Sequence, residues 1–389
     1  MDNQKQQDMS AGYLRSHYRN AGLYLPEELF VRLDQEASDA SEVDDALPNE
    51  LNVDLTPAND AVVEAISMDI EPESLSPTIP VFDLELVKNA LLKQQRDNSD
   101  RAQLAMMVLE DMAVNEGQRR LIEQPPAEIF SRFARLETEM PNFAPIITLL
   151  TAELALACAS RPEDFRVTCI CLNGVPGIGK TRFAKEVGKI LGVGFEHFSM
   201  GSAQGCFELT GTSSSWTNTR PGRLVSFMAK SSSACPLILL DEIDKIDGDG
   251  RFPIIPALLD LLEWDTAKQF RDDCLELRFD ASKIIFLATS NERSLIPPPL
   301  LSRMRVVDVL IPTSAQRRAI IERMAGEYAE LGVSFQADVL DAVCDFDMDL
   351  RQMTQMVRGM AGQVLAKGEK VVTMPPENLS KEGARMGFV

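Results

Sequence analysis

One eight-residue segment, Gly174-Val-Pro-Gly-Ile-Gly-Lys-Thr181, constrains the fold of this 389-residue chain more than any other feature. It fits G-x-x-x-x-G-K-[ST], a pattern that binds nucleotide phosphates when a strand precedes it and a helix follows it. An apolar run at 167–172 precedes the segment, and apolar residues from Phe183 to Leu191 recur after it at helical spacing. The pattern therefore predicts a strand, a phosphate-binding loop and a helix within an α/β fold.

The loop supplies backbone and side-chain groups that suit ATP and Mg²⁺. Its glycines let backbone N–H groups turn toward the β- and γ-phosphates, where the positive end of the following helix adds attraction. We expect Lys180 to neutralise phosphate charge and the Thr181 hydroxyl to coordinate Mg²⁺. The expected nucleotide contacts are Gly174, Val175, Pro176, Gly177, Ile178, Gly179, Lys180, Thr181 and Arg182.

Two carboxylates end a second apolar run. Residues 237–240 are followed directly by Asp241 and Glu242, and neighbouring residues at a strand end point to different sides. A nucleotide site needs one carboxylate for the Mg²⁺ shell and another to polarise the attacking water. We assign the first role to Asp241 and the second, catalytic role to Glu242; the alternative is a pair of acids that begins a solvated turn.

A third apolar run, at 284–289, ends at Ser290 and Asn291. The Asn291 amide is a candidate hydrogen-bond donor to the γ-phosphate or to the attacking water. A turn-forming asparagine is the alternative interpretation.

Apolar, β-branched runs alternate with helical segments between residues 166 and 311, which is typical of a parallel sheet covered by helices. After a proline, Thr313 and Gln316 form a capping box, and helical spacing continues to about residue 367. We expect an αβα P-loop core at 141–311 and a helical lid with a tail at 312–389. A helical segment at 81–140 and an acidic, mostly flexible region at 1–80 precede them. The expected strands are 167–172, 195–199, 237–240, 284–289 and 306–311.

Charge and composition limit the classes of partner. The net charge is −20, and residues 1–80 hold 17 Asp and Glu against 4 Lys and Arg, so the other 309 residues carry only −7. An acidic surface repels phosphate backbones, which disfavours nucleic acid. No uninterrupted apolar run reaches the ~18–20 residues that span a bilayer, and no signal peptide is recognisable. We therefore expect a cytoplasmic protein with reduced thiols; Cys169 and Cys171 alternate toward one buried face.

Four motifs resemble one family. They are Asn173-GVPGIGKT-Arg182, Leu239-LDEIDKI-Asp247, Phe279-DASKIIFLATSN-Glu292 and Ile296-PPPLLSRM-Arg305. In their order and spacing, residues from about 140 to 364 resemble the ATPase module of Lon-type AAA+ proteins. The resemblance implies an AAA+ core with a helical lid, ATP and Mg²⁺ as ligands, and ATP hydrolysis.

The resemblance also implies roles for single residues. Asn291 matches the sensor asparagine, and Arg303 matches the arginine finger that reaches ATP in a neighbouring subunit, so a ring, expected to be a hexamer, is implied. Arg351 falls near a second sensor on the lid. Trp216 falls on the pore residue that contacts a threaded polypeptide, with an anchor that packs its loop onto a neighbour as the alternative. Residues 247–251 are a candidate second pore loop.

One departure from the family concerns proteolysis. Lon proteases carry a Ser–Lys peptidase domain after the lid, and only 38 residues follow Arg351 here, so we expect no peptidase activity. Our leading hypothesis is a ring-shaped ATPase that remodels or unfolds a protein partner. The alternative is a nucleotide-switched scaffold or sensor that assembles on ATP and recruits a separate effector. A DNA-handling motor ranks lowest.

Overall fold

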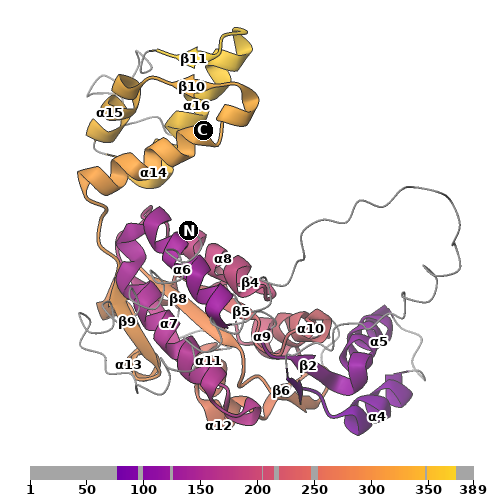
Figure 1. Ribbon diagram of the computed structural model, residues 1–389. Coiled ribbons are helices and arrows are strands. Elements are labelled where there is room, and N and C mark those ends of the chain that lie inside the picture. The colour runs from indigo at the N-terminus through magenta and orange to yellow at the C-terminus, as the bar shows by residue number, and fades with distance from the viewer. Residues whose placement is uncertain are drawn as a thin grey trace, which may run out of the picture.

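The computed structural model describes residues 77–94, 100–122, 126–203, 205–213, 219–246, 253–346 and 348–373. The acidic region at 1–76, most of the expected flexible segment, lies outside these ranges. Figure 1 shows a central sheet with helices on it, a separate group of helices at the top, and a helical hairpin at the lower right.

Five parallel strands form the central sheet, in the order β4-β5-β8-β3-β9. The three central strands are almost wholly buried, as their near-continuous apolar sequences require. The α/β fold with a parallel sheet that the sequence predicted is confirmed. The strands are β3 (Cys169–Asn173), β4 (Phe195–Ser199), β5 (Leu237–Asp241), β8 (Ile285–Ser290) and β9 (Met304–Asp308).

Helices connect and cover these strands. Helix α8 (Lys180–Leu191) packs against β5 and β8, and α7 (Ala144–Ala159) packs against β3 and α6 (Pro126–Glu139). The apolar face of α8 is buried at Phe183, Ala184, Val187 and Leu191. The remaining core helices are α9 (Phe207–Thr210), α10 (Arg223–Lys230), α11 (Ile255–Leu262), α12 (Trp264–Ala267) and α13 (Pro298–Leu301).

In its described residues the lid contains three α-helices around its own apolar cluster, which is separate from the main core. These helices are α14 (Ser314–Gly326), α15 (Ala337–Asp345) and α16 (Leu350–Ala366). The Thr313–Gln316 capping box at the start of α14 is present as expected. A two-residue parallel pair, β10 (Ser334–Phe335) and β11 (Val371–Val372), shows that the lid is not entirely helical.

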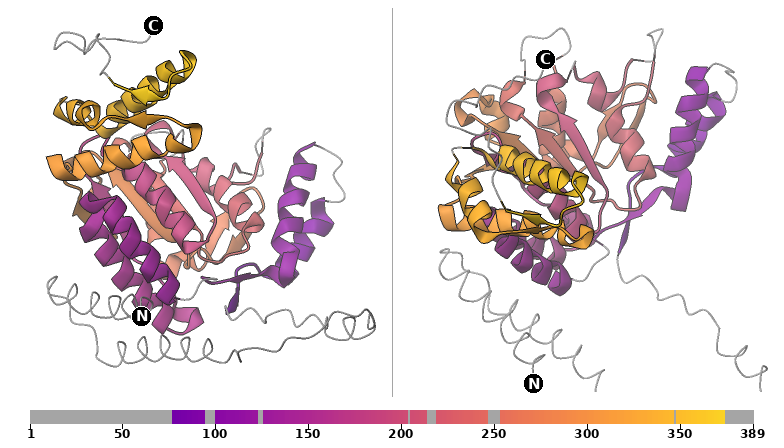
Figure 2. Two further views of the ribbon diagram at one scale, coloured as in Figure 1. Left: turned by 45° about the horizontal axis from the view of Figure 1, so that its top comes forward. Right: turned by 90° about the horizontal axis from the view of Figure 1, so that it is seen from above.

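The segment before the core mixes helices with a small sheet. Helices α4 (Leu84–Gln94) and α5 (Asp100–Ala113) form a hairpin, and α5 packs on α10. In Figure 2 this hairpin lies beside the core, away from the lid. Strands β1 (Thr78–Pro80) and β2 (Gln118–Arg120) pair antiparallel at its base. The expectation of helices alone missed this pair because three-residue strands leave too short a pattern.

Two further expectations need correction. The last strand is Met304–Asp308 and not 306–311, because the chain leaves the sheet at Val309, and Leu310 and Ile311 are 72% and 62% exposed on the way to the lid. A hairpin of β6 (Phe270–Asp272) and β7 (Leu277–Phe279) was not expected at all.

Residues Pro141–Ala159 have the length and mean hydropathy, 1.6, of a membrane-crossing helix. The search of the sequence for an uninterrupted apolar run did not select this stretch, because Glu153 interrupts it. In the fold 56% of this stretch is buried, and the Glu153 carboxylate accepts the backbone N–H of Thr168 at 3.0 Å. Both features are typical of a core helix.

Candidate functional site

The carboxyl ends of β3, β5 and β8 meet at one edge of the sheet, because parallel strands bring their equivalent ends together. A hollow of about 470 Å³ opens there, between the core and the lid. It is lined by residues 176–182 of the glycine-rich loop, by Asp241 at the end of β5 and Glu242 after it, by Asn291 after β8, and by residues from the lid. The motifs found separately in the sequence therefore share one cavity.

The loop's backbone conformation depends on its glycines. Gly177 and Gly179 have φ of +81° and +98°, values that side chains with a Cβ rarely adopt. Gly179 precedes the first turn of α8, and no described side chain caps that turn. The free N–H groups at this helix start form an anion-binding site.

Lys180 is only 8% exposed and lines the hollow. Its Nζ donates to the carbonyl oxygens of Gly174 at 2.5 Å and Val175 at 3.0 Å, and to Asn291 Oδ1 at 2.9 Å. Burial lowers the pKa of this ammonium group. The geometry holds a buried cation beside the loop and joins it to the Asn291 amide, 111 residues away in sequence.

Asp241 is at the centre of a hydrogen-bond network. The Thr181 hydroxyl donates to its carboxylate at 3.3 Å, and the Thr289 hydroxyl donates to Oδ1. His197 Nε2 lies 2.9 Å from Oδ2. Thr181 and Asp241 thus converge as two hard oxygen ligands, the type that Mg²⁺ prefers.

Glu242 lies immediately beyond the end of β5 in a strained backbone conformation, with φ +58° and ψ +49°. The Thr289 hydroxyl accepts its backbone N–H at 2.9 Å, so one threonine orients both members of the acidic pair. The Glu242 side chain is 39% exposed, and its carboxylate pairs with Lys245 Nζ at 2.6 Å. A partly exposed carboxylate at the mouth of the hollow can accept a proton from water.

Asp244 fixes the position of Asn291. Its buried carboxylate accepts the backbone N–H groups of Asn291 at 3.0 Å and Glu292 at 3.2 Å. The turn after β8 is therefore tied to the turn after β5. Asp244 was not identified from the sequence, although its place three residues after Asp241 was a usable signal.

Three other contributors were also missed. Thr289 was counted only as strand, and Lys245 only as part of a motif. His197 is one of two histidines in the chain, but its approach to Asp241 depends on β4 pairing with β5. Strand order leaves no local pattern, so only the structure could identify this contact.

Arg182 and Arg351 line the hollow, and Arg303 does not. Arg351 is exposed near the start of α16, and Arg182 pairs with Glu327 of the lid at 3.4 Å. Arg303 Nε lies 3.4 Å from a Glu263 carboxylate oxygen, and its Nη1 donates to the Pro299 carbonyl at 3.1 Å. Arg303 is thus placed away from the nucleotide-sized hollow of its own chain.

The two candidate pore segments, Trp216 and residues 247–251, lie outside the described residues. The stem of the first is described: Gly222 N–H donates to the buried Asp272 carboxylate at 2.8 Å. Thr212 N–H donates to the Arg220 carbonyl at 3.1 Å across the base of the same loop.

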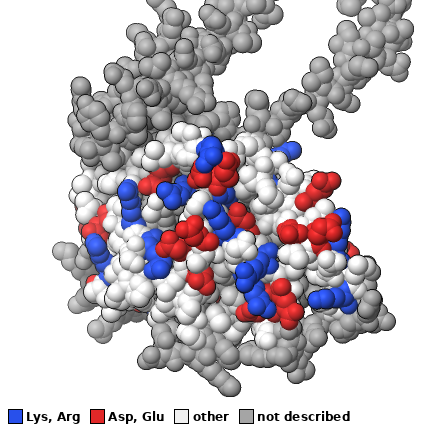
Figure 3. Space-filling view, turned by 90° about the horizontal axis from the view of Figure 1, so that it is seen from below, with Lys and Arg blue, Asp and Glu red and all other residues white. Residues whose placement is uncertain are grey.

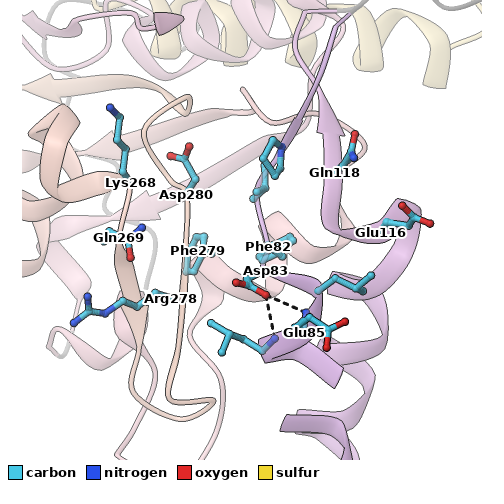
Figure 4. Close-up of a pocket in the computed structure, with 14 residues that line it drawn as sticks. Phe82, Asp83, Glu85, Glu116, Gln118, Lys268, Gln269, Arg278, Phe279 and Asp280 are labelled. Carbon is cyan, nitrogen blue, oxygen red and sulfur yellow. Dashed lines mark hydrogen bonds between the residues drawn. The ribbon is translucent and has the colours of Figure 1, made fainter. Parts of the chain in front are cut away.

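A larger hollow, about 710 Å³, lies between the start of α4 and the β6–β7 hairpin (Figure 4). Acidic Asp83, Glu85 and Glu116 line one wall, and Lys268, Arg278 and acidic Asp280 line the other. The Asp83 carboxylate caps α4 by accepting two backbone N–H groups. Among the described residues none lines both hollows, and the glycine-rich loop lines only the smaller one.

The glycine-rich loop and the strand ends lie within the range that matches a known family. A family model described as "ATPase family associated with various cellular activities (AAA)" matches residues 170–311. Lon protease 1 of Bacillus subtilis (strain 168) is 30% identical over 239 residues, 58% of this chain and 31% of the relative. The Lon protease of Wolbachia pipientis subsp. Culex pipiens is 38% identical over 154 residues, 40% of this chain and 19% of the relative.

A solved structure of a Thermotoga maritima RuvB mutant is 15% identical, with a TM-score of 0.41, and the match covers 58% of this chain and 65% of that chain. The chain spans about a third or less of the length of the two Lon proteases. The sequence matches to the family model and to the two Lon proteases confirm the resemblance to Lon-type ATPase modules that the motifs indicated.

Proposed function

We propose that this chain, whose residues 170–311 form an AAA ATPase domain, hydrolyses ATP with Mg²⁺ and uses the reaction to remodel a protein partner within an oligomeric ring. The observation that carries the proposal is the convergence of Lys180, Thr181, Asp241, Glu242 and Asn291 on one hollow beneath the lid. ATP binding is what an AAA ATPase domain implies. The use of Mg²⁺, assembly into a ring and remodelling of a protein partner are proposed in addition.

The Mg²⁺ proposal rests on the donor set. Within the described residues no three His, Cys, Asp or Glu side chains gather into a metal site of their own. Mg²⁺ does not need one, because it is usually held by one or two protein oxygens together with phosphates and water. The Thr181 hydroxyl and the Asp241 carboxylate meet that need at the phosphate loop. When bound there, Mg²⁺ would neutralise charge on the β- and γ-phosphates.

Each protein group then has a defined task. The loop N–H groups and Lys180 bind the phosphates, and Lys180 exchanges its carbonyl partners for phosphate oxygens. Glu242 accepts a proton from the attacking water as the water's oxygen bonds to the γ-phosphorus and the bond to the β-phosphate oxygen breaks. Asn291 orients that water or the γ-phosphate, and Asp244 holds Asn291 in place. Arg351 joins the site from the lid.

The ring proposal rests on Arg303. Its guanidinium lies outside the hollow of its own chain and is held by Glu263 and Pro299. A guanidinium that stabilises phosphoryl charge from such a position must serve a neighbouring chain. We propose a closed ring, with six subunits as the expected number. Mass photometry with ATP tests it, and a monomer that turns over ATP at full rate would contradict it.

For the work on a protein partner, we propose that Trp216 contacts the polypeptide. Replacing Trp216 with Ala should leave basal ATP turnover within about twofold but abolish its stimulation by casein, an unfolded polypeptide. Trp216→Phe should retain stimulation, because a flat ring grips varied side chains without hydrogen-bond specificity. Stimulation that survives in Trp216→Ala would refute the contact. Casein should remain uncleaved on a gel, because the groups at this site suit phosphoryl transfer and not peptide hydrolysis.

One observation favours the alternative, a nucleotide-switched scaffold. Lys245 pairs with the catalytic carboxylate of Glu242 at 2.6 Å, which would slow turnover wherever the pair persists. A scaffold would change its particle mass strongly with ATP and hydrolyse it slowly. Lys245→Ala distinguishes the two: turnover should rise severalfold in a restrained scaffold and change little in a working motor.

Nucleic acid is not part of the proposal. On the face shown in Figure 3, Lys and Arg are interspersed with Asp and Glu and form no continuous basic patch. The net charge of −20 also disfavours binding of nucleic acid, because it repels the phosphate backbone. Stimulation of ATP turnover by DNA would overturn this exclusion of nucleic acid. We place the activity in the cytoplasm.

A further inference from the structure

Asn142 is a buried polar residue whose side-chain amide has no hydrogen-bond partner within the described part of the chain. It lies in the short 3-10 turn Pro141–Phe143 between α6 and α7, is 7% exposed, and lines the nucleotide hollow. Neither its Nδ2 nor its Oδ1 makes a hydrogen bond, and both atoms are shielded from solvent. Leaving a buried amide unpaired costs about 1–3 kcal/mol, so such a group in a native fold calls for an explanation.

The turn that carries Asn142 is held firmly against the phosphate loop and its helix. Phe143 is fully buried and stacks on Phe183 of α8, with ring centroids 4.4 Å apart and planes 6° apart. Met140, on the other side of Asn142, approaches Gly179: a Cβ built there would lie 3.4 Å from the Met140 methyl carbon. The distance between Asn142 and the phosphate-binding groups is therefore fixed by packing.

The hollow that Asn142 lines has apolar as well as charged lining. Met140 and Ile178 from the core, and Ile320 and Met324 from the lid, line the hollow with apolar side chains and are each 3–6% exposed. Charged and polar groups line the same hollow: Asp241, Glu242, Lys180 and Asn291 at the strand ends, and Glu139, whose carboxylate accepts Arg323 Nη1 of the lid at 2.9 Å. A flat base joined to a triphosphate matches this mixed lining, with the base against the apolar side chains.

We propose that Asn142 selects the base, and that its amide turns about its side-chain bonds to hydrogen-bond the adenine edge that carries N6 and N7. This proposal rests on the nucleotide site proposed above. An amide offers one donor and one acceptor side by side, which matches the N7 acceptor and the N6 amino donor of adenine. Guanine presents two acceptors, N7 and O6, on the same edge. In either orientation the amide oxygen of Asn142 therefore faces one of these two acceptors, with which it cannot form a hydrogen bond.

The test compares equilibrium affinities of nucleoside diphosphates, which are not hydrolysed, for the full chain by isothermal titration calorimetry. The ligands are ADP, GDP and 7-deaza-ADP, which lacks only the N7 acceptor. Wild type should bind ADP about 3- to 10-fold more tightly than 7-deaza-ADP, the value of one neutral hydrogen bond. It should prefer ADP to GDP by about 5- to 150-fold.

Two variants isolate the side chain. Asn142→Leu is similar in size and should bind ADP and 7-deaza-ADP equally, and its nucleotide-free melting temperature should equal or exceed that of wild type because no amide is left unpaired. Asn142→Asp should reverse the preference and favour 7-deaza-ADP, because a carboxylate repels the N7 lone pair. Asn89→Leu, on the exposed surface of α4, is the matched control and should keep wild-type ratios.

The outcomes separate this proposal from the proposed function. If a folded Asn142→Leu protein keeps the wild-type ratios of affinity for ADP against 7-deaza-ADP and GDP, base selection by Asn142 is overturned. The proposals of ATP hydrolysis and of the ring would be unaffected. Loss of the ratios in that variant, with the Asn89→Leu control unchanged, would support it even if turnover or assembly failed. If Asn142→Leu does not fold, Asn142→Asp decides: a retained preference for ADP would overturn the proposal.

Discussion

Replacing Asp272 with Asn is expected to change how the folding stability of this protein depends on pH. Asp272 ends β6, is 1% exposed, and accepts backbone N–H groups from Gly222, Cys274 and Leu275 at 2.8–3.0 Å. Through Gly222 it ties the hairpin to the stem of the segment that contains Trp216. Burial raises the pKa of this carboxyl from 3.8 to about 6, and the three N–H groups only partly offset that rise.

The sign follows from the proton count in each state. Between pH 4 and 6 the folded protein binds more protons at Asp272 than the unfolded chain does, so stability from this group falls as pH rises through 6. Full protonation is worth about 3 kcal/mol, and between pH 5 and pH 7 the loss is about 1.3 kcal/mol. The amide of the Asp272→Asn variant does not titrate, so the variant should lack this dependence.

The assay is urea unfolding of wild type and Asp272→Asn at pH 5, 6 and 7, followed by tryptophan fluorescence. The free-energy difference, wild type minus variant, should be larger at pH 5 than at pH 7 by about 1.3 kcal/mol. Taking the difference removes the other titrating groups that both proteins share. A difference that is constant over this range, or that grows with pH, would refute the assignment of a raised pKa to the buried carboxyl.

Three further outcomes are expected. Gly177→Ala should lower the melting temperature and weaken ATP binding, at a cost of about 1–3 kcal/mol. The reason is that φ at Gly177 is +81° and the new Cβ would lie 2.5 Å from the Asp349 carboxyl. The control Gly359→Ala should not destabilise the protein, because a Cβ there meets nothing within 4 Å. Asp241→Asn should raise the Mg²⁺ concentration for half-maximal turnover by about 10- to 100-fold in steady-state assays, with circular dichroism unchanged. Arg303→Ala should lower kcat by about 10³-fold in a phosphate-release assay while ADP affinity stays within threefold; an unchanged kcat would contradict the finger assignment.

The strands that carry the site were predictable because buried parallel strands are apolar along their whole length. This pattern identified β3, β5 and β8 and placed Asp241 and Asn291 at their ends. It failed at β9, where the exposed residues Leu310 and Ile311 continue an apolar run beyond the sheet. Hydrophobicity alone does not show where pairing stops.

The side chains that orient the site were mostly not predictable. Thr289 and His197 contact Asp241 only because β8 and β4 flank β5, and strand order leaves no mark in local sequence. Asn142 lies in an unremarkable Met-Pro-Asn-Phe segment, and its importance rests on burial without a partner. Asp244 is the exception, because its spacing from Asp241 was visible in the sequence.

The most direct test of the account measures ATP turnover and particle mass for wild type beside Glu242→Gln, with and without ATP. Wild type should turn over ATP and form an ATP-dependent ring by mass photometry. The glutamine variant should bind ATP, lose turnover by about 10²-fold or more because it lacks the general base, and accumulate as the ring. A wild type that stays monomeric with ATP and releases no phosphate would contradict the assignment of Glu242 as catalytic base and of Arg303 as a residue that acts on a neighbouring subunit.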